Sequence, residues 1–195
     1  MKDLDRLLQR WRIAKVSPFI PSGGRILDIG CGDGALFKRL HGRIGEGVGV
    51  DPTLTAPVQA ERYRLLPGYF PAALPDGRAF DAITLLAVLE HIPICEQPAF
   101  AAECARLLEP GGVMLITVPS PAVDRILGVL KALRLIDGMS LEEHYGFDPR
   151  QTSAVFSVPG LILAKSATFQ LGLNHLFVFK KTGMTRSPDV RSDRG

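Results

Sequence analysis

Short aliphatic runs alternate with helix-like stretches through more than half of this 195-residue chain. The runs are apolar almost throughout and end at Gly, Pro or Asp, which is typical of strands buried on both faces of a parallel sheet. Apolar residues at helical spacing fill 35–42 and 98–112 between the runs. This order predicts right-handed crossovers and a doubly wound, mostly parallel α/β fold. The expected strands are 25–30, 47–51, 62–66, 80–87 and 112–119.

The two ends of the chain extend this arrangement. Two apolar runs at 161–170 and 174–180 are joined by too few residues for a helix, so we expect an antiparallel hairpin at the sheet edge. We expect one domain over 1–182 and a disordered tail over 183–195, which has too few apolar side chains to anchor it. An amphipathic N-terminal helix is expected over 4–15, with these apolar residues at helical spacing: Leu4, Leu7, Leu8 and Trp11.

Composition places the chain among ordinary folded proteins, with 46% hydrophobic and 22% charged residues. Its three cysteines form no CxxC pair, and its four histidines have no ligand-like spacing, so we predict a reducing compartment and no metal site. The N-terminus is charged, and no apolar run reaches the roughly 20 residues of a membrane span. These features predict a cytoplasmic protein.

The net charge of +3 comes from the ends of the chain. Residues 1–15 and 180–195 each contain five basic and two acidic residues, whereas the part between them is net negative. A nucleic-acid interface needs positive charge on the folded face that docks. We therefore predict no nucleic-acid partner.

The segment Asp28-Ile-Gly-Cys-Gly-Asp-Gly34 lies where the first strand is expected to turn into a helix. Its glycines remove side chains from the turn, so a ligand can approach backbone amides there. Asp51 follows Gly30 by 21 residues, at the end of the second strand, where doubly wound folds hold ribose hydroxyls with a carboxylate. Together, turn and carboxylate indicate a nucleoside-containing ligand.

The glycine spacing distinguishes between such ligands. Dinucleotide sites favour GxGxxG, whereas this turn reads GxGxG with Asp28 two residues ahead. A carboxylate at that point would repel a pyrophosphate and suits a ligand with an ammonium group, such as an amino acid.

Four segments resemble, in order, the motifs of the class I S-adenosylmethionine-dependent methyltransferases: DIGCGDG at 28–34, GVGVDP at 47–52, FDAITLLAVLEHI at 80–92 and LLEPGGVMLITVPSP at 107–121. The resemblance implies a Rossmann-like sheet of seven strands with an antiparallel last strand. It also implies S-adenosylmethionine as cofactor and methyl transfer as activity.

The resemblance implies roles for named residues. The loop around Asp28 would hold the methionine moiety, Asp51 the ribose, and the end of the fourth strand would lie near the sulfonium. Many relatives carry an acid for the adenine amino group after the third strand, but 67–77 contains no acid before Asp76, and Phe70 either stacks on adenine or belongs to the core. The implied cofactor-binding residues are Asp28, Gly30, Cys31, Gly32, Gly34, Asp51, Pro52, Phe70, Leu86 and Ala87.

The acceptor side is expected in an insert at 121–150, between the fifth and sixth strands, where these enzymes usually build the acceptor pocket. His144 is our candidate general base, with Glu143 and Tyr145 to orient it or to bind the acceptor; a solvent-facing loop histidine is the alternative. His91 follows the fourth strand, and a structural role under the next helix is the favoured interpretation.

The apolar stripe at 122–137 has three interpretations: a lid, a membrane-surface helix, or packing against the sheet. The insert is small, which favours a small-molecule or lipid-like acceptor. Two rival functions are considered. One is a non-catalytic protein that binds S-adenosylmethionine or a partner. The other is a nicotinamide-dependent reductase, against which the GxGxG spacing and the absence of a Tyr-x-x-x-Lys pair argue.

Overall fold

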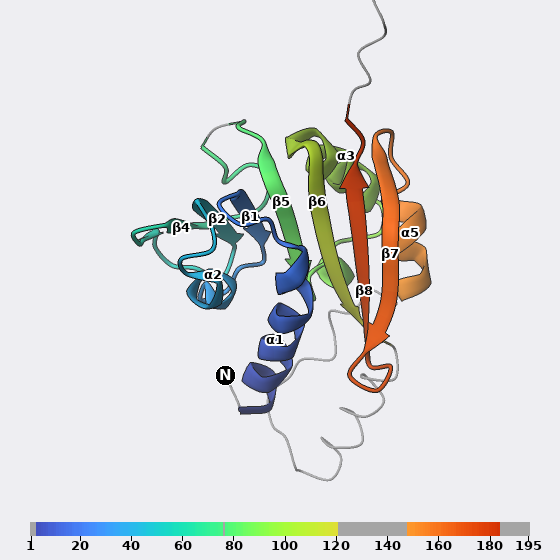
Figure 1. Cartoon of the computed structure of the whole chain (residues 1–195), viewed down its shortest axis with the longest axis horizontal. Helices are drawn as coiled ribbons and strands as arrows, with labels where there is room; N and C mark the ends of the chain where they lie inside the picture. Colours follow the sequence, from blue (N-terminus) through green and yellow to red (C-terminus); the bar gives the residue numbers. More distant parts are fainter. Residues whose placement is uncertain (1–2, 76, 121–147, 184–195) are drawn as a thin grey trace, which may run out of the picture.

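The computed structural model describes residues 3–75, 77–120 and 148–183 (Figure 1). Most of the expected insert and the expected disordered tail lie outside these residues. The described residues form one eight-stranded sheet in the order β3-β4-β2-β1-β5-β6-β8-β7. The strands are β1 Arg25–Ile29, β2 Glu46–Asp51, β3 Val58–Gln59, β4 Tyr63–Pro67, β5 Phe80–Leu86, β6 Leu108–Pro119, β7 Leu161–Phe169 and β8 Asn174–Lys181.

The centre of the sheet is parallel. β4, β2, β1, β5 and β6 run in one direction, and β8 lies antiparallel between β6 and β7. The doubly wound, mostly parallel sheet with an antiparallel last strand is thus confirmed. The eighth strand, β3, pairs antiparallel with β4 and is absent from the sequence prediction, because its two residues are exposed and form no apolar run.

Helices cover both faces of the sheet, with α1 and α2 on one face and α3 and α5 on the other (Figure 1). The α-helices are α1 Asp3–Val16, α2 Ala35–Leu40, α3 Gln97–Leu107 and α5 Thr152–Val155. Short 3-10 helices are η1 Ser17–Phe19, η2 Leu89–His91 and η4 Pro149–Gln151.

The N-terminal helix is confirmed, but its packing face differs from the apolar stripe that defined it. Ile13 and Val16 are buried against the sheet, at 2% and 0% exposure, whereas Leu7 and Trp11 remain 44% and 50% exposed. The helix therefore has two apolar faces. The sheet covers the face that contains Ile13 and Val16, and the face that contains Leu7 and Trp11 remains exposed.

The helix expected over 98–112 ends earlier, at Leu107, and β6 begins at Leu108. Pro110 disfavours helical backbone at the residue before it, and Leu108 already has extended backbone angles. Lys181 from β8 donates from Nζ to the carbonyl oxygens of Ala105 and Leu108, at 2.8 and 2.5 Å, and so satisfies two acceptors at this helix end.

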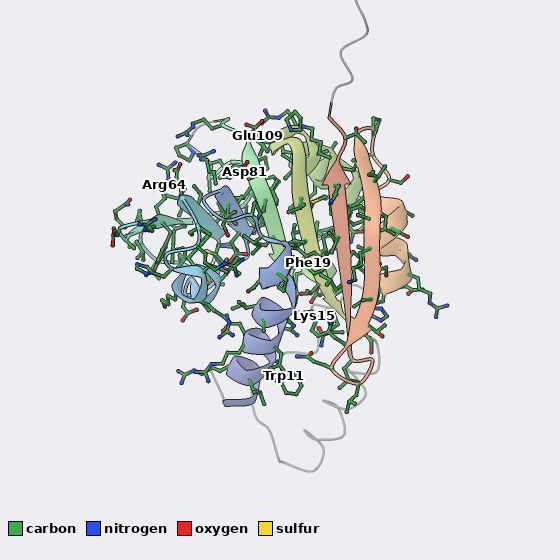
Figure 2. The ribbon with its side chains drawn as sticks, viewed as in Figure 1. Trp11, Lys15, Phe19, Arg64, Asp81 and Glu109 are labelled. Atoms are coloured by element: carbon green, nitrogen blue, oxygen red, sulfur yellow. The ribbon has the colours of Figure 1, made fainter. Side chains whose placement is uncertain are left out.

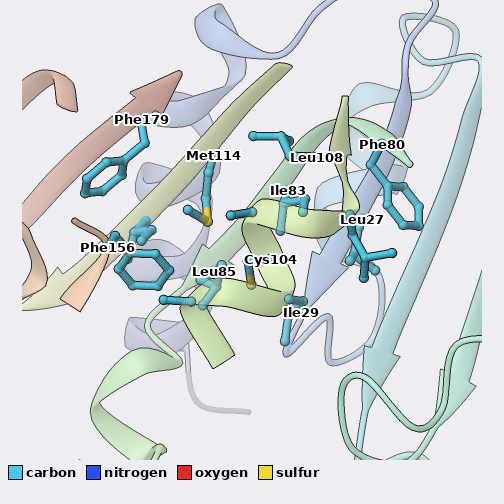
Figure 3. Close-up of a cluster of buried hydrophobic side chains, with 14 of the residues drawn as sticks. Leu27, Ile29, Phe80, Ile83, Leu85, Cys104, Leu108, Met114, Phe156 and Phe179 are labelled. Atoms are coloured by element: carbon cyan, nitrogen blue, oxygen red, sulfur yellow. The ribbon is translucent and has the colours of Figure 1, made fainter. Parts of the chain in front are cut away.

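A hydrophobic core fills each side of the sheet. On the α3 and α5 side, Cys104 and Met114 are fully buried, and the Phe156 and Phe179 rings lie 5.6 Å apart (Figure 3). Strand order reverses at β1, which pairs with β2 on one side and β5 on the other. In open α/β sheets, a ligand crevice forms at such a reversal, outside the carboxyl ends of the strands.

Candidate functional site

The glycine-rich turn lies at this reversal. The Gly30 N–H donates to the carbonyl of Val50 at 2.8 Å, and the Gly34 N–H donates to the carbonyl of Cys31 at 2.9 Å. The first bond ties the carboxyl end of β1 to that of β2, and the second closes the turn before α2 begins. Gly32, at the middle of the turn, has φ of +51°, a left-handed conformation that favours glycine.

The three glycines have different surroundings. A Cβ at Gly30 would lie 2.3 Å from Cγ2 of Val88, and one at Gly34 would lie 3.1 Å from Cδ1 of Leu65. A Cβ at Gly32 would meet nothing within 4 Å. Gly30 and Gly34 therefore allow close packing, whereas Gly32 borders open space.

Asp51 holds this turn from the end of β2. One carboxylate oxygen accepts the Gly32 N–H at 2.7 Å, and the other accepts the N–H and hydroxyl of Thr53 at 2.8 and 2.6 Å. A carboxylate has about four acceptor positions, so capacity for a ligand hydroxyl remains. Asp51 is only 7% exposed. It thus orders the loop, and the sequence predicts that it also binds the ligand's ribose.

Asp28 lies near the end of β1 and is 3% exposed. Burial raises the pKa of its carboxyl from 3.8 to about 7; the hydrogen bond from Thr84 counteracts this rise, and the charge of Asp51 adds to it. The Thr84 hydroxyl donates to Oδ1 at 2.6 Å. A cation beside Asp28 would favour the charged carboxylate, because opposite charge lowers an acid's pKa.

Asp28 opens onto a cavity of about 190 Å³. Five of the expected cofactor residues line it: Asp28, Gly30, Cys31, Leu86 and Ala87. Ala87 has φ of +59°, unusual for a residue with a side chain, and its N–H donates to the carbonyl of Thr117 at 2.9 Å. Strained backbone of this kind often accompanies ligand sites.

Helix α1 supplies three residues to this cavity, and none of them was predicted from the sequence. Gln9, Arg12 and Ile13 line it together with the buried Asp28. Arg12 donates from Nε to Oδ1 of Asn174 at 3.2 Å, which anchors its side chain to the start of β8. The cavity therefore brings together one carboxyl and one guanidinium.

A second cavity, of about 220 Å³, lies on the other side of Gly30, which lines both. Pro52 and Phe70, two further candidate cofactor residues, line it, and the Phe70 ring packs edge-on against Phe100 with centroids 5.0 Å apart. Tyr69, Val88, His91, Ile92 and Glu96 also contribute to its wall. The cavity is largely apolar. Glu96 supplies a carboxyl to its wall, whereas the region after the third expected strand, where many relatives carry an acid, does not.

Not all of the expected residues line a cavity. Gly32, Gly34 and Asp51 line neither of these two cavities, and Gly34 packs against Leu65. Cys31 does line the first cavity, but its thiol is buried, and burial and the charge of neighbouring Asp28 raise its pKa, so it remains protonated. His91 is exposed at the second cavity, away from the one that holds Asp28. The candidate catalytic residues Glu143, His144 and Tyr145 lie outside the described residues.

Two further properties concern the residues that the structure describes. None of the helices formed by them has the length and apolar character to span a bilayer. Within the same residues, no three His, Cys, Asp or Glu side chains gather in a way suited to a metal ion.

Comparison with known proteins places this geometry in a family. A methyltransferase domain model matches residues 2–157. The ubiquinone biosynthesis O-methyltransferase of Psychrobacter cryohalolentis is 32% identical over 132 residues, covering 60% of this chain and 50% of that protein. The chain thus spans about half the length of curated relatives of this kind.

Solved structures share the fold at low sequence identity. The methyltransferase from Haloferax volcanii, in complex with the Trm112 activator, superposes with a TM-score of 0.67 at 16% identity, over 95% of this chain and 98% of that one. NodS, an N-methyltransferase from Bradyrhizobium japonicum bound to S-adenosylhomocysteine, gives 0.64 at 14% identity, over 89% and 87%. Because the family model covers well over half of the chain, the protein belongs to the class I S-adenosylmethionine-dependent methyltransferases.

Proposed function

We propose that this chain transfers a methyl group from S-adenosylmethionine to a hydroxyl group of a small, lipid-like acceptor. The observation that carries the cofactor part is the cavity shared by Asp28 and Arg12. A free amino acid carries one ammonium and one carboxylate, and this cavity offers one group of each opposite charge. A dinucleotide carries no such pair, which disfavours the nicotinamide-dependent rival.

The residues present fit each part of the cofactor. Asp28 would bind the ammonium, Arg12 the carboxylate, and Asp51 the ribose hydroxyls through its remaining acceptor capacity. The apolar cavity beyond Gly30 suits a flat purine, with Phe70 against one side of it.

When bound, S-adenosylmethionine supplies a methyl group already activated by a positively charged sulfur. The protein's task is then to align the acceptor and exclude water, which is worth up to about 7 to 11 kcal/mol. Leu86 and Ala87 are suited to exclude water at the end of β5. We retain His144 as the candidate base that removes the hydroxyl proton, with Glu143 and Tyr145 beside it in sequence.

The acceptor class is supported by two observations. Curated relatives are named ubiquinone biosynthesis O-methyltransferases, which supports an oxygen atom of a small molecule as the acceptor. The wall of the cofactor cavity includes α1, whose outward face is apolar, and this suits delivery of a lipid-like molecule.

Calorimetry with S-adenosylhomocysteine tests the cofactor site. Arg12→Gln should weaken binding by about 10- to 100-fold, because a charged hydrogen bond is worth about 1.5 to 3 kcal/mol. Arg39→Gln, on the exposed face of α2, is the matched control and should bind as the wild type does. Equal affinity of all three proteins would contradict the placement of the methionine carboxylate.

Transfer itself is tested with methyl-labelled S-adenosylmethionine and simple catechols or prenylated phenols. Labelled ether products that require the protein support the proposal. Tight S-adenosylhomocysteine binding without transfer to these phenols or to a cell extract would favour the non-catalytic binding protein.

A further inference from the structure

We propose that the outward face of α1 and the tip of the β7–β8 hairpin form a docking surface for an anionic lipid bilayer. We call this the α1 surface, and its apolar members are Leu7, Trp11, Ala14 and Leu171. Leu7, Trp11 and Leu171 are 44%, 50% and 102% exposed, and Ala14 is exposed as well. Figure 2 shows Trp11 on the lower part of α1, away from the body of the sheet.

The apolar residues on α1 recur in a pattern that normally faces a core. Leu7, Trp11 and Ala14 are spaced by four and three residues, so they lie along one side of the helix. The opposite side already packs against the sheet through Ile13 and Val16. The outward stripe therefore has no role in joining α1 to the sheet, and contiguous exposed apolar surface of this kind indicates an interaction site.

The hairpin tip is fixed next to this stripe. Gln170 donates from Nε2 to the carbonyl of Leu8 at 3.5 Å, and Lys15 lies over the Phe169 ring at 5.9 Å from its centroid. Leu171 follows at φ of +56°, a conformation that turns usually give to Gly or Asn. Leucine at this φ is unfavourable for the backbone, and its side chain is fully exposed. We therefore infer that the Leu171 side chain contacts a partner outside the described residues.

Positive charge identifies the occupant. Arg6 and Arg10 flank the stripe on one side and Lys15 on the other, and all three are exposed. Interfacial helices combine tryptophan and leucine with flanking basic residues, which attract anionic headgroups. Two copies of this surface would bring like charges together, so a second copy of the chain fits less well than an anionic bilayer.

Docking by this surface would bring the cofactor cavity to the membrane. Gln9 and Arg12, on the inner side of α1, line that cavity. A lipid-like acceptor could then enter from the bilayer without crossing water; this last step, unlike the docking itself, rests on the proposed function.

Trp11 gives a direct readout, because it is the only tryptophan in the chain. The full chain is mixed with phosphatidylcholine vesicles, with or without phosphatidylglycerol, and with vesicles carrying brominated acyl chains. We expect a blue shift of Trp11 emission and quenching by bromine with anionic vesicles only. Raising the salt concentration should weaken binding, since the charges are screened.

Substitutions define the surface. Leu171→Ser should weaken partitioning by about tenfold, and Arg10→Gln by about fivefold, in line with the contribution of one basic residue near an anionic surface. Ile162→Ser is the matched control: it removes an apolar side chain that is 55% exposed on β7, far along the strand from the tip, and should bind as the wild type does.

Several outcomes would overturn the proposal. Trp11 emission that vesicles leave unchanged, or equal vesicle binding by Leu171→Ser and the wild type, contradicts it. Emission that is already blue-shifted without lipid would place another part of the chain, or at high concentration a second copy, over Trp11. S-adenosylhomocysteine binding, measured without vesicles, distinguishes the two proposals. If the protein binds this ligand but not vesicles, only the docking proposal fails; if it does not bind this ligand, the proposed function fails.

Discussion

Asp28→Asn should make the cofactor-free protein more stable while weakening its cofactor site. Burial holds the pKa of Asp28 at about 7 instead of 3.8. Because this folded-state pKa is raised, the folded protein binds the proton more tightly than the unfolded chain does. The group therefore lowers stability as pH rises from about 4 to about 7, and its full cost of about 4 kcal/mol remains above pH 7.

Asparagine keeps the shape and can still accept the Thr84 hydroxyl, but it carries no charge. Its amide has its own burial cost of about 1 to 3 kcal/mol. We therefore expect Asp28→Asn to raise the free energy of unfolding by about 1 to 3 kcal/mol at pH 8. At pH 4 the wild-type carboxyl is protonated in the folded state, so this advantage should disappear.

Cofactor binding should change in the opposite direction. An ammonium beside Asp28 requires the carboxylate, so wild-type affinity for S-adenosylhomocysteine should fall by about tenfold for each pH unit below 7. Asp28→Asn should bind about 10- to 100-fold more weakly at pH 8 and lose this dependence on pH.

Urea denaturation at pH 4 and 8, with calorimetry between pH 6 and 8, measures both effects. Thr53→Val is a useful control because it removes a hydroxyl bound to the neighbouring carboxylate without touching Asp28. Lower stability of Asp28→Asn at pH 8, or a wild-type affinity that does not vary between pH 6 and 8, would refute the reasoning.

Two further substitutions examine the turn. Asp51→Ala should cost about 1.5 to 3 kcal/mol of S-adenosylhomocysteine affinity by calorimetry, and it should also loosen the loop, because it removes the acceptor of the Gly32 N–H; unchanged affinity in a folded variant would argue against ribose binding. Gly32→Val should abolish detectable binding while circular dichroism retains the sheet signal, since the added side chain fills open space; normal binding would make the turn purely structural.

The central strands and the mostly parallel class of the sheet could be predicted because these strands are buried on both faces. All five residues of β1 are buried, so its apolar run carries a clear signal. β3 has no such signal because both of its residues are exposed. The apolar spacing predicts too late an end for α3 because it continues through Leu108, whereas the backbone becomes extended there ahead of Pro110.

The candidate site also contains one part that a local sequence pattern indicates and one part that only the fold brings together. Asp28 and the glycines are neighbours in sequence, so their spacing alone indicated a ligand with an ammonium group. Arg12 reaches the same cavity from a helix outside the motif, and its side chain is bonded to Asn174, 162 residues away. Only the folded sheet brings these two segments together, so no local pattern could have paired Arg12 with Asp28.

The GxGxG motif shows why a motif alone does not assign roles to its members. Gly30 and Gly34 are required because Val88 and Leu65 occupy the space that a side chain would need. Gly32 has open space beside it, yet its N–H is held by Asp51. Substitution at Gly30 or Gly34 should therefore perturb packing first, whereas substitution at Gly32 acts on ligand access. Asp51 couples the two functions, because the carboxylate that would bind the ligand also fixes the glycine that admits it.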